Sequence, residues 1–539
     1  MSADTDTETL TGLAPRTVTA FAAFAGVMSA AVVLGVAEAV SLFVGAAGSP
    51  LFAVGSLVID LAPAGVKEVV IALFGTGDKA ALLALMGILI VLISGAAGVL
   101  ELRRPSFGVI VIGIGGVIAL IAVITRAGAT GFNGIATVIG GVAGVVVLRL
   151  SIERLGRWRR AAERGSSAVV VRTSRGRPVA GPELERRGFL TLAVVAGAAS
   201  VVVGTGARLI NATSSKVAAI RTTLTLPKAA SPAKPVPAGA TIDVPGISPF
   251  VTPNADFYRI DTALQVPTID PDKWMLKITG LVENEVSLSF AELLAKPLEE
   301  HLATLTCVSN DVGGDLIGNA LWLGYPIREL LAQAVPKPGA DMVLSTSVDG
   351  FTAGTPLSVL QDTGTNALLA VGMNGEPLPL EHGFPVRMVV PGLYGYVSAT
   401  KWVVELRVTK FSDDQGYWTP RGWDAKGPIK LASRIDTPRS GASLAAGTVA
   451  IAGVAWEQHV GVKSVEVQVD DGLWAQATLA DSISADTWRQ WVYRWPATAG
   501  SHKIRVRATD ASGTTQSQTY QPPAPNGSQG WDSITVTVS

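Results

Sequence analysis

Cys307 is the one cysteine of the 539-residue chain, and it stands where a strand is expected to give way to a loop. Residues 304–306 are apolar or β-branched, which predicts a strand. Residues 308–314 are polar and contain glycine, which predicts a loop. Sites are commonly built at strand ends, but a free cysteine is also often a small buried apolar side chain. Taken alone, Cys307 leaves both interpretations open.

The cysteine and histidine content excludes several redox centres. One cysteine permits no disulfide within the chain, no iron–sulfur cluster and no Cys-x-x-Cys-His haem attachment. All four histidines lie beyond residue 300: His301, His382, His459 and His502. The 43 basic and 43 acidic residues give a formal net charge of zero, which makes no case for a nucleic-acid partner.

Short segments between residues 246 and 434 follow one another in a known order. They are TPNADFYR (252–259), WMLKITG (274–280), TLTC (304–307), ALWLG (320–324), HGFPVR (382–387) and KW (401–402). In this order, with the aligned cysteine, the chain resembles the sulfite oxidase family of molybdopterin enzymes from Pro245 to its end. The resemblance includes the β-sandwich dimerisation domain of that family.

The resemblance implies roles for particular residues. Cys307 matches the thiolate that ligates molybdenum, and Tyr417 falls near the active-site tyrosine of the family; with Arg259 they form the implied catalytic set. The positions implied to line the pterin cofactor or its oxyanion pocket are Asn254, Arg259, His382, Arg387 and Lys401. A high-valent metal favours a soft, anionic thiolate. Arginine and lysine bind phosphate by charge-assisted hydrogen bonds, and a neutral imidazole adds a directed donor.

Two departures from the family leave the substrate open. The residues after Cys307 are Val308-Ser309-Asn310-Asp311, without the basic stretch that helps sulfite oxidases hold their anionic substrate. Residues 394–400 lack the arginine found there in many sulfite oxidases. The expected reaction is two-electron oxygen-atom transfer on a small molecule: sulfite, or an S-oxide or N-oxide reduced in the opposite direction. The alternative is a non-catalytic surface module that has lost its metal.

Five apolar stretches are long enough for helices that cross a bilayer, which takes ~20 residues. They cover roughly residues 18–45, 79–100, 106–125, 133–150 and 189–207 by that length. The stretch 61–74 carries Lys67 and Glu68, which favours an interfacial or re-entrant piece. Histidine ligands for a membrane haem are absent from these stretches, so electrons are expected to pass to a separate protein or a quinone.

The positions of the arginines predict how the helical bundle is oriented in the lipid membrane. Arg103 and Arg104 lie between the second and third stretches, and ten arginines lie in 154–187. Cytoplasmic loops are rich in basic residues, so both loops and the N-terminus are expected inside. Everything after about residue 208 is then outside the cytoplasmic membrane, with Arg126 as a minor exception.

Two further features of the bundle invite functional hypotheses. Glu38 lies within the first stretch, where a carboxylate either marks a site or pairs with a hydroxyl or backbone group. Arg186 and Arg187 precede Gly188-Phe189-Leu190, which resembles a twin-arginine export signal. An ordinary basic flank is the alternative for this pair.

The segments predict a multi-domain chain: an α-helical membrane bundle, an α+β molybdopterin domain and a β-sandwich. We expect four spans and an arginine-rich loop in 1–187, a fifth span in 188–210, a proline-rich linker in 211–245, the catalytic domain in 246–434 and an immunoglobulin-like domain in 435–539. Alternating residues in 465–469, 504–508 and 534–538 predict strands of that last domain. A homodimer is possible through it.

Overall fold

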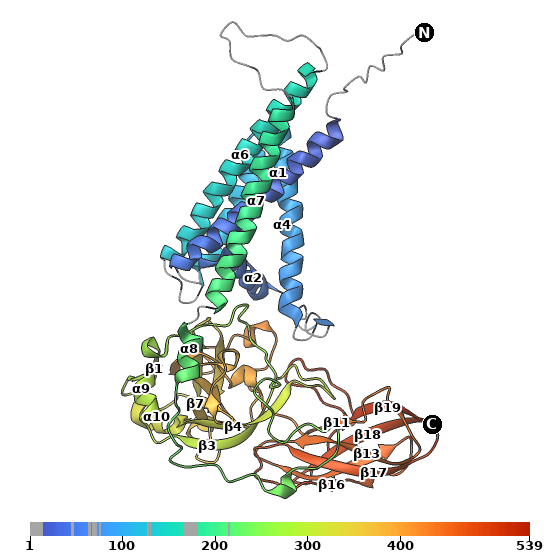
Figure 1. Ribbon diagram of the computed structural model, residues 1–539. Helices are drawn as coiled ribbons and strands as arrows, with labels where there is room; N and C mark the ends of the chain where they lie inside the picture. Colours follow the sequence, from blue (N-terminus) through green and yellow to red (C-terminus); the bar gives the residue numbers. More distant parts are fainter. Residues whose placement is uncertain are drawn as a thin grey trace. The chain divides into compact units, whose positions relative to one another are not determined.

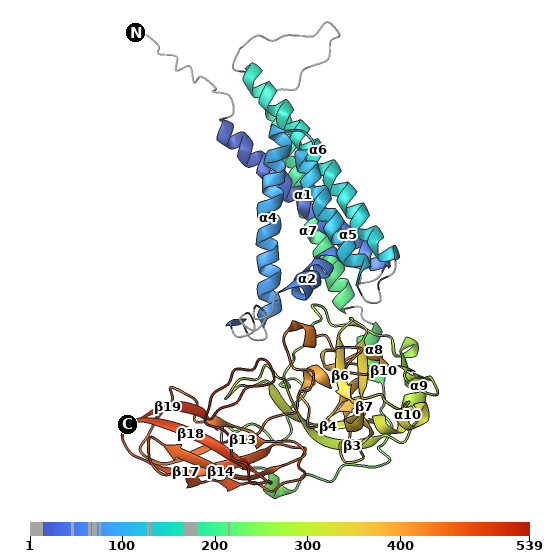
Figure 2. The same cartoon turned by 180° about the vertical axis from the view of Figure 1, so that it is seen from behind.

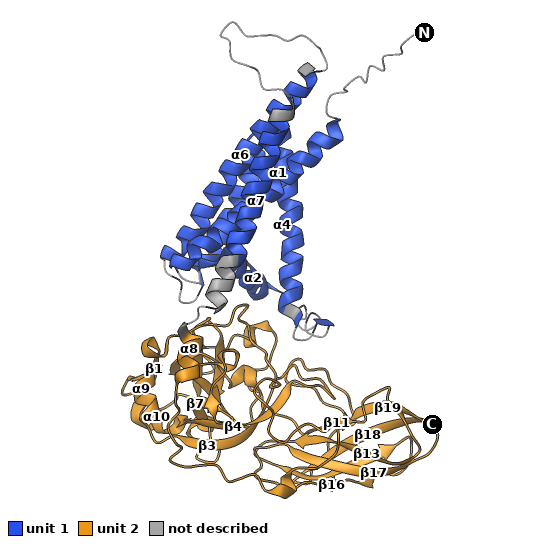
Figure 3. Ribbon diagram, in the orientation of Figure 1, with its two compact units in different colours: residues 1–215 blue, residues 216–539 orange. Residues whose placement is uncertain are grey.

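The computed structural model describes residues 14–44, 48–62, 66, 70, 73–74, 77–126, 129, 131–165, 182–213 and 216–539. The chain divides into two compact units, residues 1–215 and 216–539 (Figure 3). The structure does not describe Lys67, Glu68 or residues 166–181, the middle part of the predicted arginine-rich loop. Each unit is described by itself.

The first unit is a bundle of helices (Figures 1 and 2). Its helices are α1 (Pro15–Val44), α2 (Pro50–Leu61), α4 (Asp78–Arg103), α5 (Phe107–Ile124), α6 (Gly134–Gly165) and α7 (Pro182–Thr213). Among the described residues, five helical segments are apolar and long enough to cross a membrane: Pro15–Val44, Lys79–Arg103, Phe107–Ile124, Gly131–Glu163 and Glu185–Thr205. Each coincides with one of the five predicted stretches.

Small residues bring these helices together. A β-carbon on Gly26 of α1 would overlap the backbone of α4 at Ser94, and one on Gly98 would overlap α1 at Ala22. Close backbone approach of this kind is typical of helix pairs in membranes, where lipid is as apolar as the side chains. Helix α1 also packs against α6 and α7.

Two buried carboxylates of the bundle, Glu38 and Glu101, accept hydrogen bonds. The Ser49 hydroxyl donates to Glu38 Oε1 at 2.6 Å, and Glu38 is buried. Glu101, a buried carboxylate near the end of α4, accepts from the backbone N–H groups of Ser106 and Val109, each at 3.1 Å. These two amides begin α5, so Glu101 satisfies donors that the first turn of a helix leaves open. Glu38 thus has the hydroxyl partner that one of the two hypotheses proposed.

The second unit begins with a segment that lies against the domain following it. Helix α8 (Lys216–Thr223) is followed by an extended, proline-rich run, as the composition predicts. Leu224 and Leu226 pack on the core, and the amide of Ala230 donates to the carbonyl of Leu298 at 2.7 Å. Arg221 donates to the carbonyl of Leu378 at 2.8 Å. The linker is therefore ordered along the surface of the domain.

A mixed sheet and an antiparallel sheet, with short helices, form the α+β domain. The first sheet has the order β2-β1-β10-β5-β6, and the second has β3-β4-β7-β8 with β9 paired to β7. The elements are β1 (Met275–Gly280), β2 (Val286–Ser289), α9 (Phe290–Leu294), β3 (Glu299–Thr306), β4 (Ile317–Pro326), α10 (Ile327–Ala334), β5 (Met342–Ser347), β6 (Thr352–Pro356), α11 (Leu357–Gln361), β7 (Leu368–Met373), β8 (Glu376–Pro377), η6 (Leu380–His382), β9 (Arg387–Val389) and β10 (Val403–Thr409). Helix α9 starts with a capping box between Ser289 and Glu292.

A β-sandwich forms the end of the chain. Its sheets have the orders β11-β13-β17-β16 and β12-β19-β18-β14-β15. The strands are β11 (Ala432–Thr437), β12 (Ser443–Leu444), β13 (Gly447–Trp456), β14 (Val462–Val469), β15 (Ala475–Gln476), β16 (Thr478–Leu479), β17 (Arg489–Ala497), β18 (Gly500–Asp510) and β19 (Asp532–Val538). Burial alternates strictly along β19. The three strands predicted from alternation are confirmed as β14, β18 and β19.

Candidate active site

Cys307 follows the last residue of β3, so the predicted strand-to-loop position is confirmed. The residue is 9% exposed, and its backbone amide donates to the carbonyl of Leu316 at 2.9 Å. The amide of Ser309 points at Cys307 Sγ from 3.4 Å. Burial raises the pKa of the thiol, while the Ser309 amide and Lys401 lower it. Burial is the larger effect, so the pKa of the thiol lies above its ordinary value, and the Ser309 amide and Lys401 offset it only in part.

His382 lies in the loop before β9 and contacts the segment that contains Asn254. His382 Nε2 lies 3.2 Å from the carbonyl oxygen of Asn254, and because a carbonyl only accepts, Nε2 carries the proton. Burial and the neighbouring cations Arg387 and Lys401 lower the pKa of His382 to about 4. The ring is therefore neutral at physiological pH. The Asn254 amide in turn donates to Met373 and accepts from Asn374.

Arg387 begins β9 and is 5% exposed. Its guanidinium donates to two neutral carbonyls, those of His382 at 3.2 Å and Met388 at 3.3 Å, and stacks over the ring of Trp322. Burial lowers the pKa of Arg387 to about 10, so the group stays charged. A buried guanidinium held by neutral acceptors retains its attraction for an anion.

Lys401 and Arg259 share a carboxylate. Lys401 Nζ lies 2.7 Å from Asp261 Oδ2 and donates also to the carbonyl of Glu381 at 3.1 Å. Arg259 Nε donates to the same Asp261 oxygen at 2.9 Å, and its side chain is 34% exposed. Burial lowers the pKa of Lys401 to about 8, against the attraction of Asp261. Lys401 is therefore the buried cation of the pair and Arg259 the accessible one.

These side chains make a positively charged site. In the part of the chain that the structure describes, Arg259 and Lys401 pair with Asp261, whereas Arg387 donates to neutral carbonyls. Three cations around one carboxylate leave an excess of positive charge at this site, and one of them, Lys401, acts on the Cys307 thiol. Such an excess is stabilised by a bound anion.

Two tyrosines beside Cys307 were missed by the sequence analysis. Tyr258 is half-buried and stacks on Phe257; burial and the charge on Cys307 raise the pKa of its phenol, and Arg387 opposes them. Burial and Cys307 raise the pKa of Tyr394 to about 12. Tyr258 directly precedes Arg259 in the TPNADFYR segment, which was the available signal.

Tyr417, the tyrosine proposed from the sequence, lies in a different group of side chains. Its ring is 5.9 Å from that of Phe351 and 5.2 Å from that of Trp418, and the guanidinium of Arg421 stacks over it at 3.7 Å. Its backbone amide donates to Thr352 at the start of β6. Its catalytic role stays a prediction.

Comparisons with known proteins place this site in a family. Residues 263–418 match the oxidoreductase molybdopterin-binding domain, and residues 432–506 match the bacterial Ig domain. The uncharacterized oxidoreductase YuiH of Bacillus subtilis is 36% identical over 159 residues, which cover 29% of this chain and 76% of YuiH. Chicken sulfite oxidase is 30% identical over 322 residues, covering 51% of this chain and 69% of that protein. The chain belongs to the sulfite oxidase family.

The chain aligns with only part of the length of some members of the sulfite oxidase family. Human mitochondrial sulfite oxidase is 30% identical over 323 residues, which cover 51% of this chain but 58% of the human protein. Cys307, His382, Arg387, Lys401 and Tyr417 lie within the matched molybdopterin-binding domain, whereas Asn254, Arg259 and Asp261 precede it.

The family implies a molybdopterin cofactor, and the donor set fits one. Cys307 offers the single sulfur ligand that the chain can contribute. The pterin carries a phosphate, and Arg387 and Lys401 are buried cations suited to an anionic group. The neutral ring of His382 can hold pterin heteroatoms without adding charge.

Proposed function

We propose that this chain is a membrane-anchored molybdopterin oxidoreductase that works outside the cytoplasmic membrane. The observation that carries the proposal is a buried cation beside one thiol: Lys401 acts on Cys307, and a second buried cation, Arg387, acts with Cys307 on Tyr258. A site of this kind suits a metal–thiolate bond together with an anionic cofactor. Cys307 is the metal ligand, and the cations with Asn254 and His382 hold the cofactor.

The proposed reaction is oxygen-atom transfer to or from a small molecule. Oxidation of sulfite takes an oxygen atom from water and releases two protons and two electrons; reduction of an S-oxide or N-oxide consumes two of each and releases water. When bound, the molybdenum centre supplies the two-electron chemistry. The chain binds and orients the substrate, with the accessible Arg259 as the cation for an oxyanion.

Proton handling falls to the tyrosines. Tyr258 keeps its phenolic proton at neutral pH, because its pKa is raised, and so can donate a hydrogen bond near Cys307. Tyr417 remains the second candidate. His382 is neutral and donates to Asn254, which suits orientation better than proton transfer.

The electrons travel through a separate electron-transfer protein or a quinone. The helical unit offers five apolar helices and no histidine, so it serves as an anchor rather than a haem carrier. Export by the twin-arginine route through Arg186 and Arg187 would deliver the protein with its cofactor inserted.

Metal analysis of purified protein tests the proposal. We expect about one molybdenum per chain, as one thiolate ligand implies, and a thiolate-to-metal absorption band. Cys307→Ser should abolish the band and the activity while leaving the fold intact, since serine is nearly isosteric. Ser443→Ala, at an exposed serine of β12, is the matched control. A fully active Cys307→Ser protein would refute the ligand assignment, and a metal-free native protein would favour the non-catalytic module.

A further inference from the structure

The loop that follows Cys307 is held by the immunoglobulin-like domain as well as by its own domain. Ser528 Oγ donates to the carbonyl of Asn310 at 2.7 Å. Arg434 of β11 donates to the carbonyl of Gly314 at 2.8 Å. The Tyr520 hydroxyl donates to the Asp311 carboxylate at 3.1 Å. Two parts of the β-sandwich, β11 and the connection between β18 and β19, thus contact residues 310–314.

Gly313 lets the two domains approach closely. Its φ of +76° is in the left-handed region, and a β-carbon there would lie 2.6 Å from Asp532 Oδ1 at the start of β19. Any other residue would be strained and would push against this buried carboxylate. The loop is therefore shaped to fit against the β-sandwich.

The strand that delivers Cys307 is held in the same way. The Thr304 amide donates to the carbonyl of Asp486 at 2.9 Å, and the Thr304 hydroxyl accepts from the amide of Trp488 at 2.8 Å. The Gln458 side chain donates to the Thr304 carbonyl at 2.9 Å. All of these atoms are buried, so each bond resists movement of β3 three residues before the thiol.

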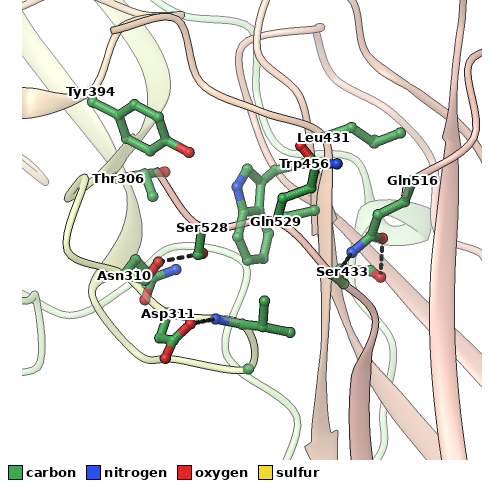
Figure 4. A pocket seen from close by; sticks show the side chains of 14 residues that line it. Thr306, Asn310, Asp311, Tyr394, Leu431, Ser433, Trp456, Gln516, Ser528 and Gln529 are labelled. Atoms are coloured by element: carbon green, nitrogen blue, oxygen red, sulfur yellow. Dashed lines mark hydrogen bonds between the residues drawn. The ribbon is translucent and has the colours of Figure 1, made fainter. Parts of the chain in front are cut away.

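A small cavity lies between the loop and the β-sandwich (Figure 4). Its volume is about 20 Å³, room for about one water, and Thr306, Asn310, Tyr394, Trp456 and Ser528 help to line it. The buried Thr306 hydroxyl finds no hydrogen-bond partner among the described residues. A missing contact from the β-sandwich would therefore leave the residue next to Cys307 with space to move.

We propose that the immunoglobulin-like domain is a positioning domain for the thiol: Gln458 holds β3, Ser528 holds the loop, and together they fix Cys307 Sγ. The inference rests on the proposed function only in the identity of Cys307 as the ligand. Metal ligands are held in place by groups around them that do not touch the metal. Here those groups come from a domain that follows in sequence by more than a hundred residues.

Alkylation of Cys307 by iodoacetamide in full-length, cofactor-free protein tests the proposal. Cys307 is the only thiol, so the rate reports its exposure and thiolate fraction directly. Ser528→Ala and Gln458→Met each remove one hydrogen bond with little change of shape. We expect the rate in the double variant to rise about thirtyfold, the factor for two hydrogen bonds of typical net strength. The single variants should each give about a fivefold rise.

Asn526→Ala is the control, because the Asn526 side chain donates to Asp424 and accepts from Lys430 across the same two domains, and neither bond goes to β3 or to the loop. Its alkylation rate should stay within twofold of the parent. Circular dichroism of every variant checks that the fold is retained. The alkylation rate of each variant in urea serves as the reference for its rate in the folded state. Rates in both test variants within twofold of the parent would overturn the proposal. An equal rise in Asn526→Ala would do the same, since the effect would then be general loosening. The assay needs no molybdenum, so its failure is separate from failure of the ligand assignment.

Discussion

Asp261 Oδ2 is shared between Lys401 Nζ at 2.7 Å and Arg259 Nε at 2.9 Å, so one carboxylate holds a buried cation and an accessible one together. Asp261→Asn should destabilise the cofactor-free protein by about 3–5 kcal/mol, because it leaves the charge of Lys401 buried and unpaired. Urea titration, followed by the reactivity of Cys307, measures the change. Asp471→Asn is the control, since the Asp471 side chain is 98% exposed. Equal midpoints for the two variants would show that the shared carboxylate contributes little.

His382 should make the cofactor-free protein acid-sensitive. Its pKa is about 4 in the folded chain against an ordinary value of 6.5, so the unfolded chain binds the proton first as the pH falls. Stability is therefore present above pH 6.5 and is lost between 6.5 and 4, by on the order of 3 kcal/mol in all. Urea midpoints across this window should fall less steeply in His382→Gln. An unchanged slope in that variant would place the titration elsewhere.

The sequence predicted those site residues that belong to recognisable local segments. Cys307 ends a strand because the residues before it favour one, and the ordered segments brought out Asn254, His382, Arg387 and Lys401. The structure joins them through the contacts of His382 with Asn254 and of Lys401 with Asp261. Asp261 has no feature of its own in the sequence to mark it as the shared carboxylate.

What escaped prediction depends on contacts between distant residues. Proline content correctly indicated an extended segment after residue 226, but it could not show that Leu224 and Leu226 pack on the core. The alternation of β14, β18 and β19 predicted the sandwich, whereas the contact of Ser528 with Asn310 joins residues 218 positions apart. Tyr417, and not Tyr258, was predicted as the catalytic tyrosine because the sequence does not show which tyrosine lies near Cys307.

Tyr258→Phe and Tyr417→Phe decide between the two tyrosines. The Tyr258 phenol is coupled to Cys307 and Arg387, so its loss should lower kcat by about a hundredfold, the lower range for a positioned proton donor. Tyr417→Phe keeps the ring that packs beneath Arg421, and we expect a smaller effect. Molybdenum content should stay constant in both. The opposite order of losses would restore Tyr417 as the catalytic tyrosine.

Reporter fusions test the side of the membrane. The arginines of 154–187 predict that a reporter active only outside the cytoplasm is silent after Gly165 and active after Ser214. The reverse pattern would overturn the orientation. Changing Arg186 and Arg187 to lysine keeps the charge but should block export if the twin-arginine route is used. Undiminished export would leave the pair as flanking charge.

Haem absorption and turnover measurements test whether the electron partner is a separate molecule. Purified full-length protein should show no haem absorption, since the chain has neither a haem attachment motif nor a histidine before residue 301. Turnover should return when membranes of its own host are added. Glu38 accepts a hydrogen bond from Ser49 at 2.6 Å, and an amide oxygen can accept the same bond, so Glu38→Gln should keep at least half of this turnover. Glu101→Gln, at the other buried carboxylate described above, is the matched control. A tenfold loss in Glu38→Gln but not in Glu101→Gln would assign Glu38 to quinone protons and make the bundle part of the electron route.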